Sequence, residues 1–198
     1  MADILSLLIG CAIGFVSAVL APIVVEQLRY CFFGPKLKVE FIEGDRDFIT
    51  DTKETGGADA HYVRIKVLNT GLQNAKQCRA YLVNVEKWNT STGKFEPTIY
   101  CDSLQLAWSA RGDTQKAYLP LDMPREIKQF IDIVSTRSTK SDYKIMTDPH
   151  LYRYEPLFKE HGKFRYTLQV SCDNVKPVSA KVVFEWSGDW DNFAVSAG

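Results

Sequence analysis

The sequence lacks a net charge of either sign, because 24 Lys and Arg residues balance 24 Asp and Glu residues over 198 positions. No overall electrostatic field therefore attracts the chain to duplex nucleic acid, which is normally bound by a basic surface. The sequence also lacks HExxH and CxxC spacings, and it contains no GxSxG, P-loop or GxGxxG motif. We therefore expect no resident metal and no cofactor, and the sequence favours a non-enzymatic protein.

The five cysteines lack a pattern as well. Cys11 and Cys31 lie within or beside an apolar N-terminal run, whereas Cys78, Cys101 and Cys172 are scattered singly through the rest of the chain. Small disulfide-rich domains carry even numbers of closely spaced cysteines. This arrangement predicts reduced thiols rather than disulfides.

No charged side chain occurs from residue 4 to residue 25, and no Lys or Arg precedes that run. A helix of this length spans about 33 Å, enough to cross a hydrocarbon core of about 30 Å. A secretory signal has a basic start, a shorter apolar run and a small-residue cleavage site. Here the best cleavage site, after Ala21, is followed directly by Pro22. We expect residues 1–34 to contain a retained transmembrane helix, with a cleaved signal as the alternative.

Basic residues follow the apolar run, and they predict its orientation. Arg29, Lys36 and Lys38 lie on its C-terminal side. Because Lys and Arg beside a membrane span stay in the cytoplasm, we expect residues 35–198 to form a cytoplasmic domain on the cell inner membrane.

Small residues recur every four positions within the run and include a GxxxG pair. They are Ser6, Gly10, Gly14 and Ala18. Such a strip lets two helix backbones approach closely in lipid. It predicts self-association, so we expect a homo-oligomer.

The remainder of the chain lacks an amphipathic helix of useful length and has no internal repeat. Apolar and polar residues alternate instead, most regularly at 163–170 and 178–186, which is typical of half-buried strands. Further strands are expected at 37–41, 62–69, 75–88, 104–108 and 127–134. About seven or eight short strands predict an all-β, Ig-like antiparallel β-sandwich, with a partly closed barrel as the alternative.

A long irregular insertion at 135–162 interrupts this pattern, and structureless connections of such length are often functional. It interleaves aromatic and basic side chains, which suit a nucleotide or phosphopeptide ligand. The candidate ligand-binding residues are Arg137, Lys140, Lys144, His150, Tyr152, Arg153 and Tyr154. The alternative is structural: Tyr152, Tyr154 and Phe158 cap the open end of the sandwich, with their hydroxyls in water.

The run YVRIKVLNTGLQNAKQCRAYLV at 62–83 resembles one in uncharacterised bacterial membrane-anchored, Ig-like β-sandwich proteins. LQLAWS at 104–109 and DNVKPVSAKVVFEWSGDW at 173–190 support the resemblance. In such proteins a single N-terminal helix precedes a strand that begins like residues 34–37, Gly-Pro-Lys-Leu. The resemblance implies an anchor and a sandwich. It implies no established activity and no functional residues.

These features predict a single-pass, membrane-anchored, non-enzymatic module that self-associates and presents a β-sandwich to a ligand or partner. The expected partners are the lipid bilayer, further copies of the chain, and a nucleotide or protein ligand. The alternative is a bacterial antiphage-defence effector, whose β-domain senses a nucleotide signal and whose helices disrupt the membrane. An enzyme, with His150 or His161 beside a carboxylate and a thiol, is the third reading.

Overall fold

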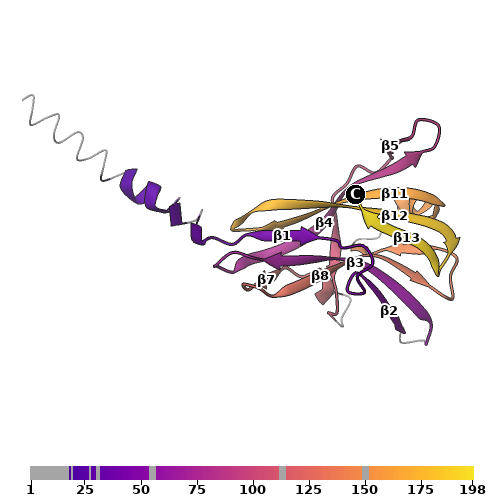
Figure 1. Cartoon of the computed structure of the whole chain (residues 1–198), viewed down its shortest axis with the longest axis horizontal. Helices are drawn as coiled ribbons and strands as arrows, with labels where there is room; N and C mark the ends of the chain where they lie inside the picture. Colours follow the sequence, from indigo (N-terminus) through magenta and orange to yellow (C-terminus); the bar gives the residue numbers. More distant parts are fainter. Residues whose placement is uncertain are drawn as a thin grey trace, which may run out of the picture.

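A computed structural model describes residues 18, 20–26, 28–29, 32–53, 57–111, 115–148 and 152–198. These residues form an antiparallel β structure with short helical turns (Figure 1). The strands are β1 (Leu37–Glu40), β2 (Ile49–Lys53), β3 (Asp59–Asn69), β4 (Ala75–Asn89), β5 (Lys94–Pro97), β6 (Leu104–Trp108), β7 (Leu121–Met123), β8 (Lys128–Arg137), β9 (Tyr143–Ile145), β10 (Thr147–Asp148), β11 (Gly162–Cys172), β12 (Val175–Asp189) and β13 (Asn192–Ala197). The helical turns are η1 (Lys116–Tyr118), η2 (Tyr152–Tyr154) and α2 (Glu155–Lys159).

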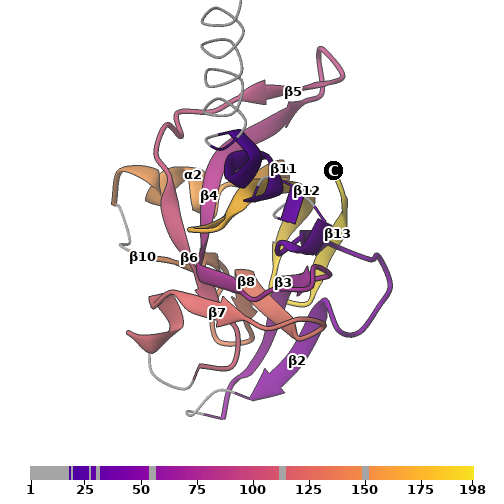
Figure 2. The ribbon, with the colours of Figure 1, turned by 90° about the vertical axis from the view of Figure 1, so that its left-hand side faces the viewer.

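The strands form one curled sheet, and this confirms the all-β prediction. The main path of the sheet runs β1-β3-β8-β6-β4-β11-β12-β13, and the short strands pair beside it. Curling brings β1 near β12, so the two ends of the path approach each other, as the end-on view shows (Figure 2). Strand β6 lies at the turning point of the sheet. Leu104 and Gln105 pair with β4, whereas Ala107 and Trp108 pair with β8.

The core fills the inside of the curl and follows the period of two seen in the sequence. On β11 the alternate residues Phe164, Tyr166, Leu168 and Val170 are buried, as predicted. Tyr143 of β9 reaches across to β12, with its ring centroid 5.1 Å from that of Phe184. Because aromatic pairs of this kind bury large apolar areas, they contribute strongly to the stability of the fold.

Helical residues precede the sheet, and their apolar side chains are exposed. Ala18 and residues 20–26 are helical, and Phe32 and Phe33 end this segment before β1. No helix within the described residues is long and apolar enough to cross a membrane. Most of the transmembrane segment predicted within 1–34, with Ser6, Gly10 and Gly14, lies outside those residues.

The prediction of reduced thiols is wrong for two cysteines. Cys78 on β4 and Cys172 on β11 form a disulfide, with a sequence separation of 94 and a Cα–Cα distance of 4.2 Å. They lie one position beyond the paired residues Arg79 and Ser171, so strand register brings them face to face. Sequence spacing alone does not reveal register. Cys101 is a free, exposed cysteine.

The segment 135–162 is not the structureless insertion that the sequence suggested. Strand β8 continues to Arg137, β9 pairs back onto it, and β10 pairs with β6. The turn η2 and the helix α2 then lead into β11. The expectation failed because these elements are only a few residues long, so they carry little periodic signal.

Candidate functional site

A pocket of about 360 Å³ lies between the β8–β9 hairpin and α2. This volume is within the range of small-molecule sites. Its charged lining consists of four cations, Arg137, Lys140, Lys144 and Lys159, and two carboxylates, Asp142 and Glu155. The local excess of positive charge favours an anionic ligand, although the whole chain carries no net charge.

Hairpin geometry places the cations at the rim. Ser135 pairs with Lys144, and Thr136 with Tyr143. Neighbouring residues of a strand point to opposite faces, so Tyr143 is buried while Lys144 is exposed. In the connecting turn, the backbone N–H of Lys140 donates to the carbonyl of Arg137 at 3.1 Å. The turn therefore holds these basic residues beside one another.

The lining of the pocket also includes apolar and aromatic side chains. Tyr143, Ile145 and Phe158 contribute to it, and all three are almost completely buried. Burial raises the pKa of Tyr143 well above its ordinary value, so its hydroxyl stays protonated. This hydroxyl shares a hydrogen bond of 3.2 Å with that of Tyr166. The pocket thus combines ring surface with a cationic rim, which suits a ligand that has an apolar part and an anionic part.

The cations differ in what they contact. Lys159 donates to Glu155 at 2.6 Å, one helical turn away, and this hydrogen bond raises the pKa of Lys159. Lys140 and Lys144 make no ion pair with any other residue that the structure describes. Their ammonium groups therefore have hydrogen-bonding capacity for an added anion.

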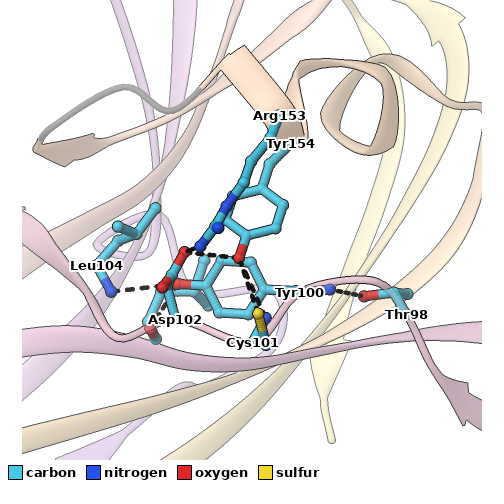
Figure 3. A network of polar contacts seen from close by, with 8 residues as sticks. Thr98, Tyr100, Cys101, Asp102, Leu104, Arg153 and Tyr154 are labelled. Atoms are coloured by element: carbon cyan, nitrogen blue, oxygen red, sulfur yellow. Dashed lines mark hydrogen bonds and ion pairs between the residues drawn. The ribbon is translucent and has the colours of Figure 1, made fainter.

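A buried tyrosine fixes α2, and thereby one wall of the pocket, to the β5–β6 connection (Figure 3). The Tyr154 hydroxyl donates to the Asp102 carboxylate at 2.6 Å and accepts from the Cys101 N–H at 3.2 Å. Arg153 forms an ion pair with the same carboxylate. The Tyr154 ring is 4.8 Å from that of Tyr100, which belongs to the core. Desolvation by burial raises the pKa of Tyr100 to about 12.

The structure divides the predicted ligand-binding residues into two groups. Arg137, Lys140 and Lys144 line the pocket, whereas Arg153 and Tyr154 belong to the Asp102 network. The side chain of Tyr152 is 81% exposed. His150 lies outside the described residues. Tyr154 and Phe158 are core residues, as in the structural alternative, although the Tyr154 hydroxyl contacts Asp102 rather than water.

Sequence reasoning missed the contribution of α2. Glu155 and Lys159 lie four residues apart, the spacing of a helical ion pair, and this signal was present in the sequence. Phe158, which the sequence assigned only to a cap, contributes to the pocket lining. The missing information was that a helix begins at residue 155.

A second polar cluster joins the β2–β3 edge to the β12–β13 turn. His61 contacts Asp51 through Nδ1 at 2.7 Å and Asp191 through Nε2 at 2.9 Å, and its ring stacks on Trp190. Both nitrogens can donate only when the imidazole is protonated. Within the described residues, no group of three or more His, Cys, Asp or Glu side chains is placed to hold a metal ion.

No family model matches the chain, and no curated protein matches its sequence. The cationic pocket is therefore the principal evidence on function.

Proposed function

We propose that this chain is a non-enzymatic, membrane-anchored module whose β-domain binds a small anionic ligand in the pocket between the β8–β9 hairpin and α2. The observation that carries the proposal is the convergence of Arg137, Lys140, Lys144 and Lys159 around one concave site. Two of these cations, Lys140 and Lys144, have no ion-pair partner among the described residues. A phosphate or carboxylate group would accept hydrogen bonds from them.

The balance of charge favours an anion over a cation as the ligand. Asp142 and Glu155 are the two carboxylates of the lining, and Glu155 already accepts from Lys159. An added cation would face four positive groups at the rim. An added anion would receive charge-assisted hydrogen bonds, each contributing about 1.5–3 kcal/mol.

Titration calorimetry on the full chain tests the site, with inorganic phosphate, a nucleoside monophosphate and an uncharged nucleoside as probes. We expect a phosphate-bearing probe to bind and the uncharged nucleoside to bind far more weakly. Lys144→Ala should weaken binding by about tenfold or more, because one charge-assisted hydrogen bond is lost. Binding should also weaken as salt is added, because the rim charges are exposed.

Lys94→Ala is the matched control, because Lys94 is an exposed lysine on β5 and lies outside the pocket lining. It should bind the probe as the unchanged chain does. Equal loss of affinity in both variants, or no binding of any anionic probe, would contradict the proposal.

A second candidate is the antiphage-defence effector, in which a nucleotide signal occupies the same pocket. The observation that favours it is the combination of two rings, Tyr143 and Phe158, with the cationic rim. The apolar part of a nucleotide would contact the exposed edges of these rings, while its phosphate pairs with the cations. Thermal-shift measurements with cyclic oligonucleotides test this candidate. An absent shift, together with unimpaired growth of cells that make the protein, would count against it.

We also propose an Ig-like sandwich as the finer architecture, with a partly closed barrel as the alternative. In support, β1, β2, β3, β8 and β9 pair among themselves, as do β4, β5, β11, β12 and β13. Ring contacts such as Tyr143 with Phe184 join these two groups across the core. Strand β6 pairs with both groups, and this feature favours the barrel. An experimental structure in which β1 hydrogen-bonds to β12 would decide for the barrel.

Anchoring and self-association remain proposals based on the apolar segment 4–25. Carbonate extraction of membranes tests the anchor. Crosslinking of the full chain tests self-association, and Gly10→Ile with Gly14→Ile should reduce the crosslinked oligomer. The basic residues after the segment favour a cytoplasmic domain, whereas the disulfide is typical of an oxidising compartment. The thiol state in cells decides between these two placements.

A further inference from the structure

The junction between the helical segment and the sheet is organised by a buried asparagine. Asn69, which has no exposed surface, makes four hydrogen bonds. Its Nδ2 donates to the carbonyls of Gln73 at 2.7 Å and Met123 at 2.9 Å. Its Oδ1 accepts from the N–H groups of Gly71 at 3.0 Å and Lys36 at 3.1 Å. Lys36, three residues after the end of the helical segment, is thereby fixed to the domain.

Glycine at position 71 makes this close contact feasible. A Cβ atom there would lie 2.3 Å from the Gly34 carbonyl oxygen and 2.4 Å from the Lys36 nitrogen. Any side chain would push the turn away from the junction. The helical segment and the β3–β4 turn also share a cleft lined by Leu28, Phe32 and Gln73. Residues 34–36, which connect this segment to β1, therefore pack against the β3–β4 turn.

Other turns meet at the same end of the domain. The N–H of Glu126 donates to the Asn69 carbonyl at 2.9 Å, which places the β7–β8 turn beside the β3–β4 turn. The N–H of Asp173 donates to the Lys76 carbonyl at 3.0 Å, and Asn174 contacts the Asn74 carbonyl. Figure 1 shows these strand ends on the side nearest the helical segment. We call residues 34–36, 69–76, 124–128 and 173–176 the anchor-proximal face.

The anchor-proximal face is basic and partly apolar. Its exposed charged residues are Lys36, Lys76, Arg125, Lys128 and Lys176 against Glu126 and Asp173. Leu72 and Ile127, whose side chains are 50% and 47% exposed, lie among them. The apolar surface continues onto the helical segment, where Phe32 is 68% exposed. A row of cations with apolar side chains between them is complementary to anionic lipid headgroups.

From this complementarity we propose that the anchor-proximal face lies on the surface of a bilayer that contains anionic lipid, with Leu72 and Ile127 at the headgroup level. The inference rests on the proposed membrane anchor, which would hold this end of the domain next to lipid. An anchor alone does not require the domain to contact lipid, because a domain on a flexible junction can turn in any direction. The lipid contact is therefore an additional claim. The hydrogen bond from the Lys36 N–H to Asn69 shortens the free junction to the residues before Lys36.

Hydrogen exchange of the full chain in vesicles tests the contact. The vesicles contain phosphatidylcholine alone, or phosphatidylcholine with phosphatidylglycerol. We expect exchange of residues 69–76 and 124–128 to slow several-fold only when phosphatidylglycerol is present, and high salt should reverse the effect. The triple variant Lys76→Glu, Arg125→Glu and Lys176→Glu should remove the protection.

The matched control is the triple variant Arg46→Glu, Lys53→Glu and Lys94→Glu, which makes the same change in charge at exposed residues outside both the anchor-proximal face and the pocket. It should keep the protection. Equal exchange in the two kinds of vesicle would overturn the inference, as would equal loss of protection in both variants. Carbonate extraction of the same vesicles reports on the anchor separately. If the chain stays in the membrane after carbonate extraction but shows no lipid-dependent protection, the lipid contact of the anchor-proximal face is refuted and the anchor is not. If carbonate releases the chain from the membrane, the anchor itself is refuted.

Discussion

We expect Asn69→Ala to destabilise the protein strongly, although it removes only a few atoms. It removes four hydrogen bonds at a position without exposed surface. Water can reach the groups freed at Lys36 and Gln73, which are exposed. The Met123 carbonyl and the Gly71 N–H belong to buried residues, so they would remain without partners.

The magnitude follows from the two groups that stay buried. An unsatisfied buried polar group costs about 1–3 kcal/mol, so the two together should lower the free energy of unfolding by about 2–6 kcal/mol. With a urea m-value of roughly 2 kcal/mol/M for a domain of this size, the urea midpoint should fall by about 1–3 M. Urea unfolding of the full chain in a fixed non-ionic detergent measures it, because Trp108 and Trp186 are buried reporters.

Two further variants make the prediction sharp. Asn69→Asp keeps the volume and the acceptor oxygen Oδ1 but loses the amide that donates to Gln73 and Met123, so it should destabilise at least as strongly as alanine. Asn74→Ala is the control, because Asn74 is exposed and its side chain makes no hydrogen bond within the described residues. A loss below about 1 kcal/mol in Asn69→Ala, or an equal loss in the control, would refute the reasoning about buried partners.

The remaining predictions concern acid stability, α2 and the thiols. Arg165 hydrogen-bonds Glu86 and lowers its pKa, so this pair stabilises the fold above the ordinary Glu pKa of 4.5 and its contribution is lost as pH falls through the lowered value. Glu86→Gln should therefore lower the free energy of unfolding by about 1–2 kcal/mol at neutral pH. The urea midpoint of this variant should also depend less on pH in the acidic range than that of the unchanged chain, and an equal dependence would contradict the stabilising role of the pair. Tyr154→Phe should lower the free energy of unfolding by about 1–2 kcal/mol, because it removes the hydrogen bond to Asp102. It should also weaken anion binding, because that hydrogen bond helps to position α2. An unchanged affinity in calorimetry would show that the pocket does not depend on this contact. Protein trapped with iodoacetamide from cells should show Cys78 and Cys172 protected until reduction, while free alkylation of both would disprove the disulfide and support the cytoplasmic placement.

The long strands could be predicted from the sequence because their signal is local. On β11 the alternation of apolar and polar residues from Phe164 to Val170 predicts which side chains are buried, and the structure confirms that prediction. The Cys78–Cys172 disulfide could not be predicted, because it depends on the register between β4 and β11, which join segments far apart in sequence. Register is set by pairing and turns rather than by composition.

The pocket was predictable in its chemistry but not in its shape. Basic residues after β8 suggested an anion site, and Arg137, Lys140 and Lys144 do line one pocket. The convergence of Lys159 on the same pocket depends on a five-residue helix that packs beside β9. A helix this short is stabilised by tertiary contacts rather than by its own propensity. Its position therefore depends on the buried side chains of Tyr154 and Phe158, which sequence patterns alone do not locate.

The two proposed surfaces lie at opposite ends of one strand, and this separation constrains how the protein could work. Strand β8 begins with Lys128 on the anchor-proximal face and ends with Arg137 at the pocket. Ten residues at about 3.3 Å per residue separate them by roughly 30 Å. That distance is several times the screening length at physiological salt, which is about 8 Å. Charge on the lipid surface therefore cannot set the affinity of the pocket directly. A domain seated on the bilayer would present its pocket away from the membrane, where a soluble anion can enter while the lipid contact is kept.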